Sequence, residues 1–170
     1  MITDRQYNGL VAAIQEYRKR LDTYSESEFL KKANADTWSA AEVYAHIISA
    51  NRMTVRGMLK AAEGNAIEDN NSLPWNARLL LFFEKFPKGR KVPEAVQKRT
   101  PVFISIAEAI ESIESLGKEL NELMLSYAKW SKTQKLKHPA LGMLNNFQWL
   151  KFMKIHSTHH LKQLDRIKNL

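Results

Sequence analysis

Apolar residues recur every three or four positions along four long stretches of the chain, approximately residues 3–21, 39–63, 104–127 and 145–169. This spacing is typical of amphipathic helices that bury one face, and the alternation expected of strands is almost absent. Ser39 and Glu42 have the spacing of a capping box at the start of the second stretch, and Gly64 follows its last turn. The pattern therefore predicts an all-α protein in which residues 25–38 form a short connection.

The longest connection, residues 66–100, joins the second and third of these helices. It contains the run NARLLLFFEKF at residues 76–86, which predicts an extra helix before Pro87, Gly89 and Pro93 interrupt regular structure. Four long helices with one long crossover form a four-helix bundle. Because no repeat, low-complexity tract or linker-like segment interrupts the chain, we expect one domain over residues 1–170.

Composition narrows the chemistry. The chain has no cysteine, which excludes disulfides, zinc ribbons, iron–sulfur clusters and a cysteine nucleophile, so any thiol chemistry would need a thiol from a small molecule. The net charge of +8 permits an acidic partner such as nucleic acid. Much of the excess of lysine and arginine lies in the predicted connections between helices, without the interleaved aromatic residues of a protein that binds single-stranded nucleic acid. We therefore expect these residues to lie in solvated loops. A docking patch for an anionic substrate or partner is the alternative. These residues are Lys85, Lys88, Arg90, Lys91, Lys98, Arg99, Lys129, Lys132, Lys135 and Lys137.

The first residues and the apolar runs of the chain bear on where the protein is located in the cell. The first residues, MITDRQYNGL, contain no apolar signal core, and no later apolar run is long enough to span a bilayer. We therefore expect a cytoplasmic protein with no membrane partner.

Three histidines are the strongest candidates for chemistry. His156 and His160 lie four residues apart in the last helix, about one turn along its axis, and both interrupt an otherwise apolar stripe. His46 lies on the buried face of the second helix, next to Ile47. Three neutral imidazoles can hold a divalent metal ion and leave coordination positions open for water or substrate. The pattern predicts such a site at His46, His156 and His160; hydrogen-bonded core histidines are the alternative.

Three neighbouring residues are weaker candidates. His159 lies one residue off the stripe, either as a surface residue or as a hydrogen-bond partner or proton carrier beside the metal. Gln163 lies one turn after His160. It is a candidate for orienting a ligand, for contacting the substrate or a bound cofactor, or for a helix–helix hydrogen bond. Glu42 fits a helix cap better than a contact with metal-bound water.

Three other residues receive structural interpretations. His138 precedes Pro139 in an expected loop and should cap or pack locally. Trp38 and Trp149, at the starts of two helices, should anchor the core, or else form walls of a pocket.

Two segments carry a resemblance to a known family. WSAAEVYAHI, residues 38–47, resembles the second-helix signature of the DinB-like superfamily. Residues 138–167 resemble its closing motif, in which His-Pro is followed by a glycine three residues later, a tryptophan opening the last helix, and then H-x-x-x-H-L-x-Q. Together the two segments cover about a quarter of the chain, and the central crossover has no counterpart to align.

The resemblance implies a four-helix bundle of the group that includes YfiT-like metal-dependent hydrolases and thiol-dependent transferases. In that group three histidines bind zinc, nickel or a similar ion, and they map onto His46, His156 and His160. The resemblance also implies homodimers, and a metal that activates either water or the thiolate of a low-molecular-weight thiol cofactor.

Three functional hypotheses follow. The first is a metal-dependent hydrolase or thiol S-transferase that acts on a small-molecule substrate, with His159 and Glu42 as candidate catalytic residues and Gln163 as a candidate for cofactor binding. The second is a non-catalytic metal-binding stress-response protein. The third, motivated only by the net charge of +8, is a nucleic-acid binder.

Overall fold

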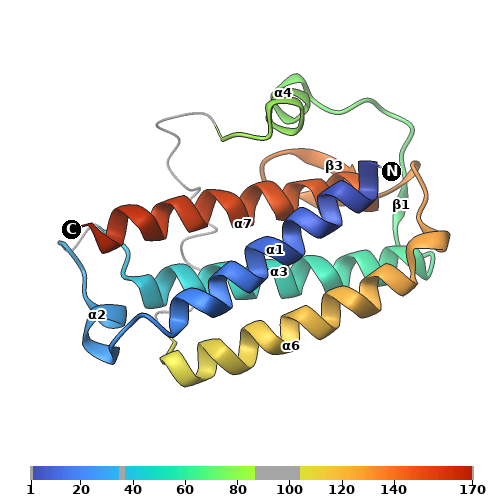
Figure 1. Ribbon diagram of the computed structural model, residues 1–170. Helices are drawn as coiled ribbons and strands as arrows, with labels where there is room; N and C mark the ends of the chain where they lie inside the picture. The colour runs from blue at the N-terminus through green and yellow to red at the C-terminus, as the bar shows by residue number, and fades with distance from the viewer. Residues whose placement is uncertain (1, 35–36, 87–103, 170) are drawn as a thin grey trace.

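The computed structural model describes residues 2–34, 37–86 and 104–169, and its frame is four long helices lying side by side (Figure 1). They are α1 (Ile2–Leu21), α3 (Ala40–Ala62), α6 (Ile106–Leu125) and α7 (Asn146–Lys168). Helices α1 and α3 each pack against both α6 and α7. The four-helix bundle predicted from the apolar spacing is confirmed, with boundaries within two residues of the expected ones.

Reciprocal side-chain caps fix the starts of three bundle helices. In each, the side chain of the residue before the helix accepts a hydrogen bond from the backbone N–H three residues later, and that residue's side chain bonds back. The start predicted at Ser39 is confirmed. The pairs are Ser39 with Glu42, Ser105 with Glu108, and Asn145 with Gln148.

Two smaller features differ from the sequence-based expectation. The expected connection contains a short helix, α2 (Glu26–Leu30), which starts with a capping box at Ser25 and buries Phe29 completely. Strands β1 (Ile67–Glu68), β2 (Gln134–His138) and β3 (Gly142–Asn145) form an antiparallel sheet in that order. The single-turn 3-10 helix η1 (Tyr127–Lys129) lies between α6 and β2. Lys135 is buried in β2, at a position where strand alternation would place an apolar residue, so the sequence does not show the alternation. Its ammonium group donates to the Asn71 carbonyl oxygen at 2.6 Å.

Polar groups also cross the core between the helices. The Tyr44 hydroxyl donates to the Tyr17 carbonyl oxygen at 2.8 Å, and the Tyr17 hydroxyl donates to the Ser157 carbonyl oxygen at 2.9 Å. Both tyrosine side chains are fully buried, and their rings meet edge to face with centroids 5.3 Å apart. These bonds tie α3 to α1, and α1 to α7 beside His156.

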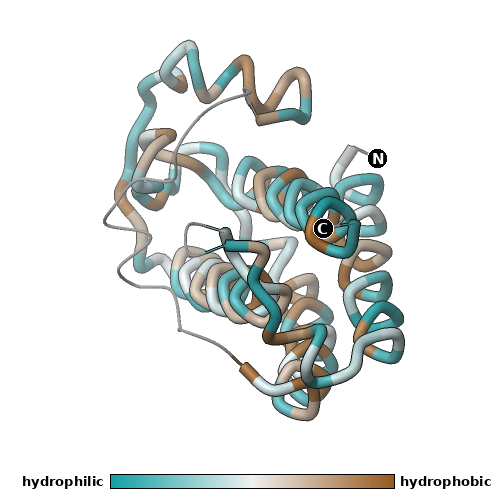
Figure 2. The backbone as a smooth tube through the Cα atoms, turned by 90° about the vertical axis from the view of Figure 1, so that its left-hand side faces the viewer, coloured by the Kyte–Doolittle hydropathy of each residue, from teal (hydrophilic) through white to brown (hydrophobic). Residues whose placement is uncertain are grey.

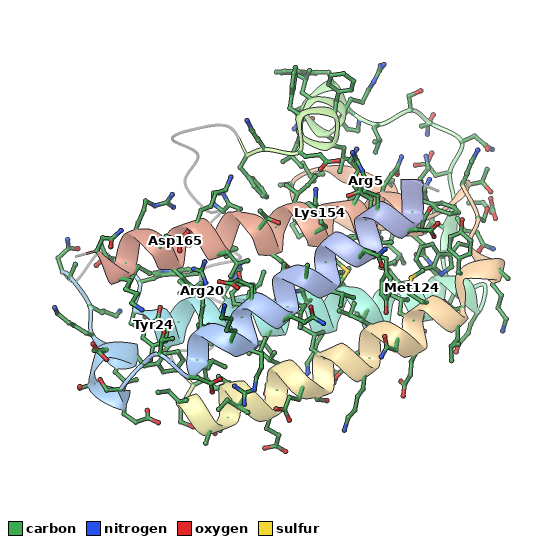
Figure 3. All side chains as sticks on the ribbon, viewed as in Figure 1. Arg5, Arg20, Tyr24, Met124, Lys154 and Asp165 are labelled. Atoms are coloured by element: carbon green, nitrogen blue, oxygen red, sulfur yellow. The ribbon has the colours of Figure 1, made fainter. Side chains whose placement is uncertain are left out.

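The extra helix predicted in the crossover is α4 (Trp75–Phe83), which lies outside the bundle on the side of α7 (Figure 1). Its end is held by Glu84, a residue with a left-handed backbone, φ 52°. The Glu84 carboxylate accepts from Arg5, Gln6, Lys151 and Lys154, and Figure 3 shows Arg5 and Lys154 pointing into this region. Burial raises the Glu84 pKa, but the hydrogen bonds, led by the one from Lys154, outweigh it and lower the pKa to about 2.

In the described part of the chain, no helix combines the length and apolar character needed to cross a membrane. Pro87, Gly89, Pro93 and the basic residues from Lys88 to Arg99 lie outside the described residues.

Candidate metal centre

The fold brings the three predicted histidines to one point between α3 and α7. The Nε2 atom of His156 lies 3.3 Å from His46 Nε2 and 3.0 Å from His160 Nε2. One ligand atom from each residue can be chosen so that all lie within 4.8 Å of one another. His46 and His160 are buried, and His156 is partly exposed as a whole residue.

The spacing of these nitrogens fits a shared metal ion. Two nitrogens each about 2.0–2.1 Å from one zinc ion lie roughly 2.9 Å apart at a right angle and 3.4 Å apart at the tetrahedral angle. The two observed separations, 3.0 and 3.3 Å, fall within this range. Hydrogen bonding alone explains these two separations less well. A neutral imidazole nitrogen either donates one proton or accepts with one lone pair, so only one of the two short contacts of His156 Nε2 can be a hydrogen bond.

Gln163 orients one of the three imidazoles. Its side-chain oxygen lies 2.7 Å from His160 Nδ1, so Nδ1 carries the proton and Nε2 keeps its lone pair for the cluster. Metal-ligating histidines usually donate their other ring N–H in this way. Of the roles predicted for Gln163, orienting a ligand is the one that this geometry supports.

Burial keeps the three imidazoles neutral, which is the form that binds metals. Burial lowers the pKa of His46 to about 4. Burial, followed by the nearby His46, lowers the pKa of His160 to about 3, although its bond to Gln163 acts in the opposite direction. The His156 pKa lies well below its usual range, because of burial first and the neighbouring His160 and His46 next.

Aromatic rings enclose the cluster. Trp38 packs edge-on against His46, with centroids 5.2 Å apart, and lies parallel to His160 at 6.3 Å. Phe152 stacks on His156 at 5.2 Å. Trp38 therefore forms a wall of the site, the alternative role predicted for it. An apolar surrounding of this kind strengthens electrostatic interactions within a site.

Phe86 is a neighbour of the cluster that the sequence pattern did not identify. Its ring centroid lies 6.0 Å from that of His156 and 4.8 Å from that of His159. Phe86 belongs to the NARLLLFFEKF run, whose apolar spacing predicts a helix but does not indicate which element it meets.

The two candidate catalytic residues occupy different environments. His159 is half-buried with its ring 5.3 Å from that of His160, and its pKa is lowered by burial and then by Arg166 and Lys162. Glu42 is the cap expected from the sequence: one oxygen accepts from the Ser39 N–H at 2.8 Å, and the other lies 2.7 Å from Lys32 Nζ. Only His159 of the two contacts a residue of the cluster in the described part of the chain.

His138 makes the local cap that was predicted for it. Its Nδ1 atom accepts from the backbone N–H groups of Ala140 and Leu141, at 3.0 and 3.1 Å, in the turn between β2 and β3. Its ring packs 5.0 Å from that of Trp149, which is buried as expected of a core anchor. Gly142 closes the same turn with φ 78°, a conformation that favours glycine and explains the glycine of the closing motif.

Comparison with known proteins agrees with this architecture. YfiT from Bacillus subtilis, described as a probable metal-dependent hydrolase with an unusual four-helix bundle topology, has a similar fold; its TM-score is 0.67, at 10% identity over 98% of this chain and 86% of YfiT. The uncharacterized protein YuaE of Bacillus subtilis (strain 168) is 27% identical over 156 residues, 88% of this chain and 92% of YuaE. The model of the DinB superfamily matches residues 10–164. The chain belongs to the DinB superfamily.

Proposed function

We propose that His46, His156 and His160 bind one divalent metal ion, with zinc and nickel as the first candidates. The observation that carries this proposal is the convergence of three neutral imidazole nitrogens, with separations of 3.0 and 3.3 Å, from two helices. The donor set fits, because imidazole suits zinc and nickel and Gln163 already holds His160 in the tautomer that presents Nε2.

We further propose that the protein is a metal-dependent hydrolase acting on a small molecule. Three protein ligands leave room for a fourth, and an ion held in this way acts as a Lewis acid that lowers the pKa of a coordinated water or thiol. The similarity in fold to YfiT, described as a probable metal-dependent hydrolase, supports hydrolysis as the first reaction to test.

The chain's own residues have separate tasks in this proposal. Gln163 holds the Nδ1 proton of His160, and Trp38 and Phe152 exclude water from two imidazole faces. His159 lies beside His160 and is the residue we assign to holding or moving a proton at the site, because its ring is half-buried and its pKa is below the usual range. We assign Glu42 a structural role, since both of its oxygens have partners.

Three further expectations belong to the same proposal. Transfer of a low-molecular-weight thiol is the other reaction that this centre could support, and a cysteine-free chain would take that thiol from solution. A cytoplasmic location and a homodimer remain predictions. A non-catalytic metal-binding protein is the competing hypothesis, and it requires that the protein converts none of the substrate classes with which it is assayed.

The experiment is a paired activity screen. Protein purified without a histidine tag, loaded with zinc or nickel, is assayed on chromogenic esters, amides and phosphoesters with and without bacillithiol, mycothiol or glutathione. The proposal predicts thiol-independent turnover that His156→Ala abolishes. Turnover that requires a thiol would identify a transferase, and inactivity in every arm would favour the non-catalytic hypothesis.

A further inference from the structure

Helix α4 carries an apolar surface that faces away from the bundle core. Ala77, Leu80 and Leu81 are its buried residues, yet four other large apolar side chains remain exposed on the same short helix. Figure 2 shows these hydrophobic turns apart from the four long helices. Exposed apolar side chains gathered in this way usually mark a binding site. They are Trp75, Leu79, Phe82 and Phe83, with exposed fractions of 74, 45, 78 and 61%.

Part of this surface forms a cavity. Trp75, Leu79, Phe83 and Phe86 line a half-open cavity of about 320 Å³ between α4 and the residues that follow it. An apolar cavity of about 150 Å³ holds one benzene molecule, and small-molecule sites begin at about 300 Å³. The cavity therefore has the size for a group of one or two aromatic rings.

Phe86 connects this cavity to the histidine cluster. The ring that lines the cavity also lies 6.0 Å from His156 and 4.8 Å from His159, measured between centroids. His156 is the partly exposed member of the three. A molecule in the cavity thus contacts the same side chain that packs on His156 of the cluster.

We propose that this cavity binds the aromatic part of the substrate whose reacting group lies at the metal centre, an inference that rests on the proposed function. Aromatic walls favour an aromatic ligand, because rings pack edge to face or offset-stacked at little entropic cost. Lys85 also lines the cavity and is exposed to solvent, so an acidic substituent on the ring strengthens binding.

Phe82 separates this proposal from other uses of the same helix. It is the most exposed of the four apolar side chains and packs on Phe83 with centroids 5.1 Å apart, but it does not line the cavity. Docking of a second copy of the chain, or of a lipid surface, would involve Phe82 at least as strongly as Phe83. The two adjacent phenylalanines are therefore a matched pair of test positions.

The test is titration with 8-anilinonaphthalene-1-sulfonate, followed by its fluorescence, in metal-free and in zinc-loaded protein. We expect Phe83→Ser to raise the dissociation constant by about tenfold or more and Phe82→Ser to change it less than about twofold, in both forms of the protein. Lys85→Glu should weaken binding of this anion but not of neutral N-phenyl-1-naphthylamine. Leu79→Ser provides a second cavity variant, and circular dichroism checks that each variant is folded.

Equal weakening by Phe82→Ser and Phe83→Ser would overturn the proposal, as would absence of saturable binding to the wild type. Self-association or vesicle binding that Phe82→Ser abolishes, without a cavity-specific effect of Phe83→Ser, would assign the surface to those partners instead. Because the cavity is measured in metal-free protein as well, failure to bind metal would refute the proposed function without obscuring this result.

Discussion

The Asn51 side-chain amide donates a hydrogen bond to the Ser157 hydroxyl at 3.2 Å, in the interior between α3 and α7. The two residues are 1% and 0% exposed. Asn51 lies five residues after His46, and Ser157 directly follows His156. Because a buried polar pair is satisfied in one register only, this bond helps to fix the axial position at which α3 presents His46 to the histidines of α7.

Asn51→Leu should therefore weaken metal binding as well as the fold. We expect the free energy of unfolding of the metal-free protein to fall by about 1–3 kcal/mol, since the buried Ser157 hydroxyl loses its partner. Zinc affinity, measured by competition with a chelator, should fall too, because the two helices are free to shift.

Thr54→Val is the matched control for that change. The Thr54 hydroxyl bonds the Ala50 carbonyl oxygen within α3 itself, so its loss leaves the register between the helices unchanged. The role assigned to Asn51 would be contradicted if Asn51→Leu bound zinc as tightly as the wild type, or if Thr54→Val lost as much zinc affinity as Asn51→Leu.

Gln163→Leu should lower zinc affinity by about 10–100-fold, the usual effect of removing a hydrogen-bond partner of a metal-ligating histidine. The cause is loss of the acceptor 2.7 Å from His160 Nδ1. Gln163→Glu keeps an acceptor and should retain most of the affinity. If both variants bind zinc as the wild type does, Gln163 does not orient His160.

His138 should make the fold sensitive to acid. Burial lowers its pKa to about 4 from an unfolded value near 6.5, and its neutral Nδ1 accepts two backbone N–H groups. Its stabilising contribution is therefore fully present above about pH 6.5 and is lost as the pH falls toward 4.

His138→Asn isolates that contribution, because an asparagine side-chain oxygen can accept the same two bonds and does not titrate. Melting temperatures of the metal-free variant should decline less than those of the wild type between pH 6.5 and 4, although the other histidines still titrate. Parallel curves over this interval would show that His138 does not contribute.

Glu84→Gln should loosen α4 without unfolding the bundle. The change removes the charge that Arg5, Lys151 and Lys154 share at the end of this helix. Hydrogen exchange of the amides in residues 75–83 should accelerate, whereas amides of α6 should be unaffected and serve as the internal reference. Unchanged protection of α4 would mean that its buried residues Leu80 and Leu81 hold it unaided.

The long helices could be predicted from sequence because two strong signals coincide there. Periodic apolar positions identify the buried faces, and the Ser39–Glu42 pair marks the start of α3, as the structure confirms. The positions of His46 and His160 within this apolar spacing also predict that both are buried, as they are. His156 was expected to be equally buried, but it is partly exposed.

The remaining features depend on contacts between distant segments. The β2–β3 hairpin was missed because Lys135 occupies a buried position that apolar alternation would reserve for a hydrophobic residue. The contact between Phe86 and His156 joins residues 70 positions apart in sequence, and local spacing carries no information about such a contact. Several roles are predicted for Gln163 and for His159; for Gln163, the 2.7 Å contact with His160 Nδ1 favours orienting that imidazole.

The most direct test of the central claim is the metal content of protein expressed and purified without a histidine tag. Elemental analysis should find about one zinc or nickel ion per chain in the wild type, and His46→Ala, His156→Ala and His160→Ala should each lose most of it while circular dichroism still shows a helical bundle. His138→Asn should retain the ion, since His138 lies outside the cluster. A wild-type chain without stoichiometric metal after exposure to either ion, or His156→Ala protein with its metal intact, would contradict the three-histidine centre.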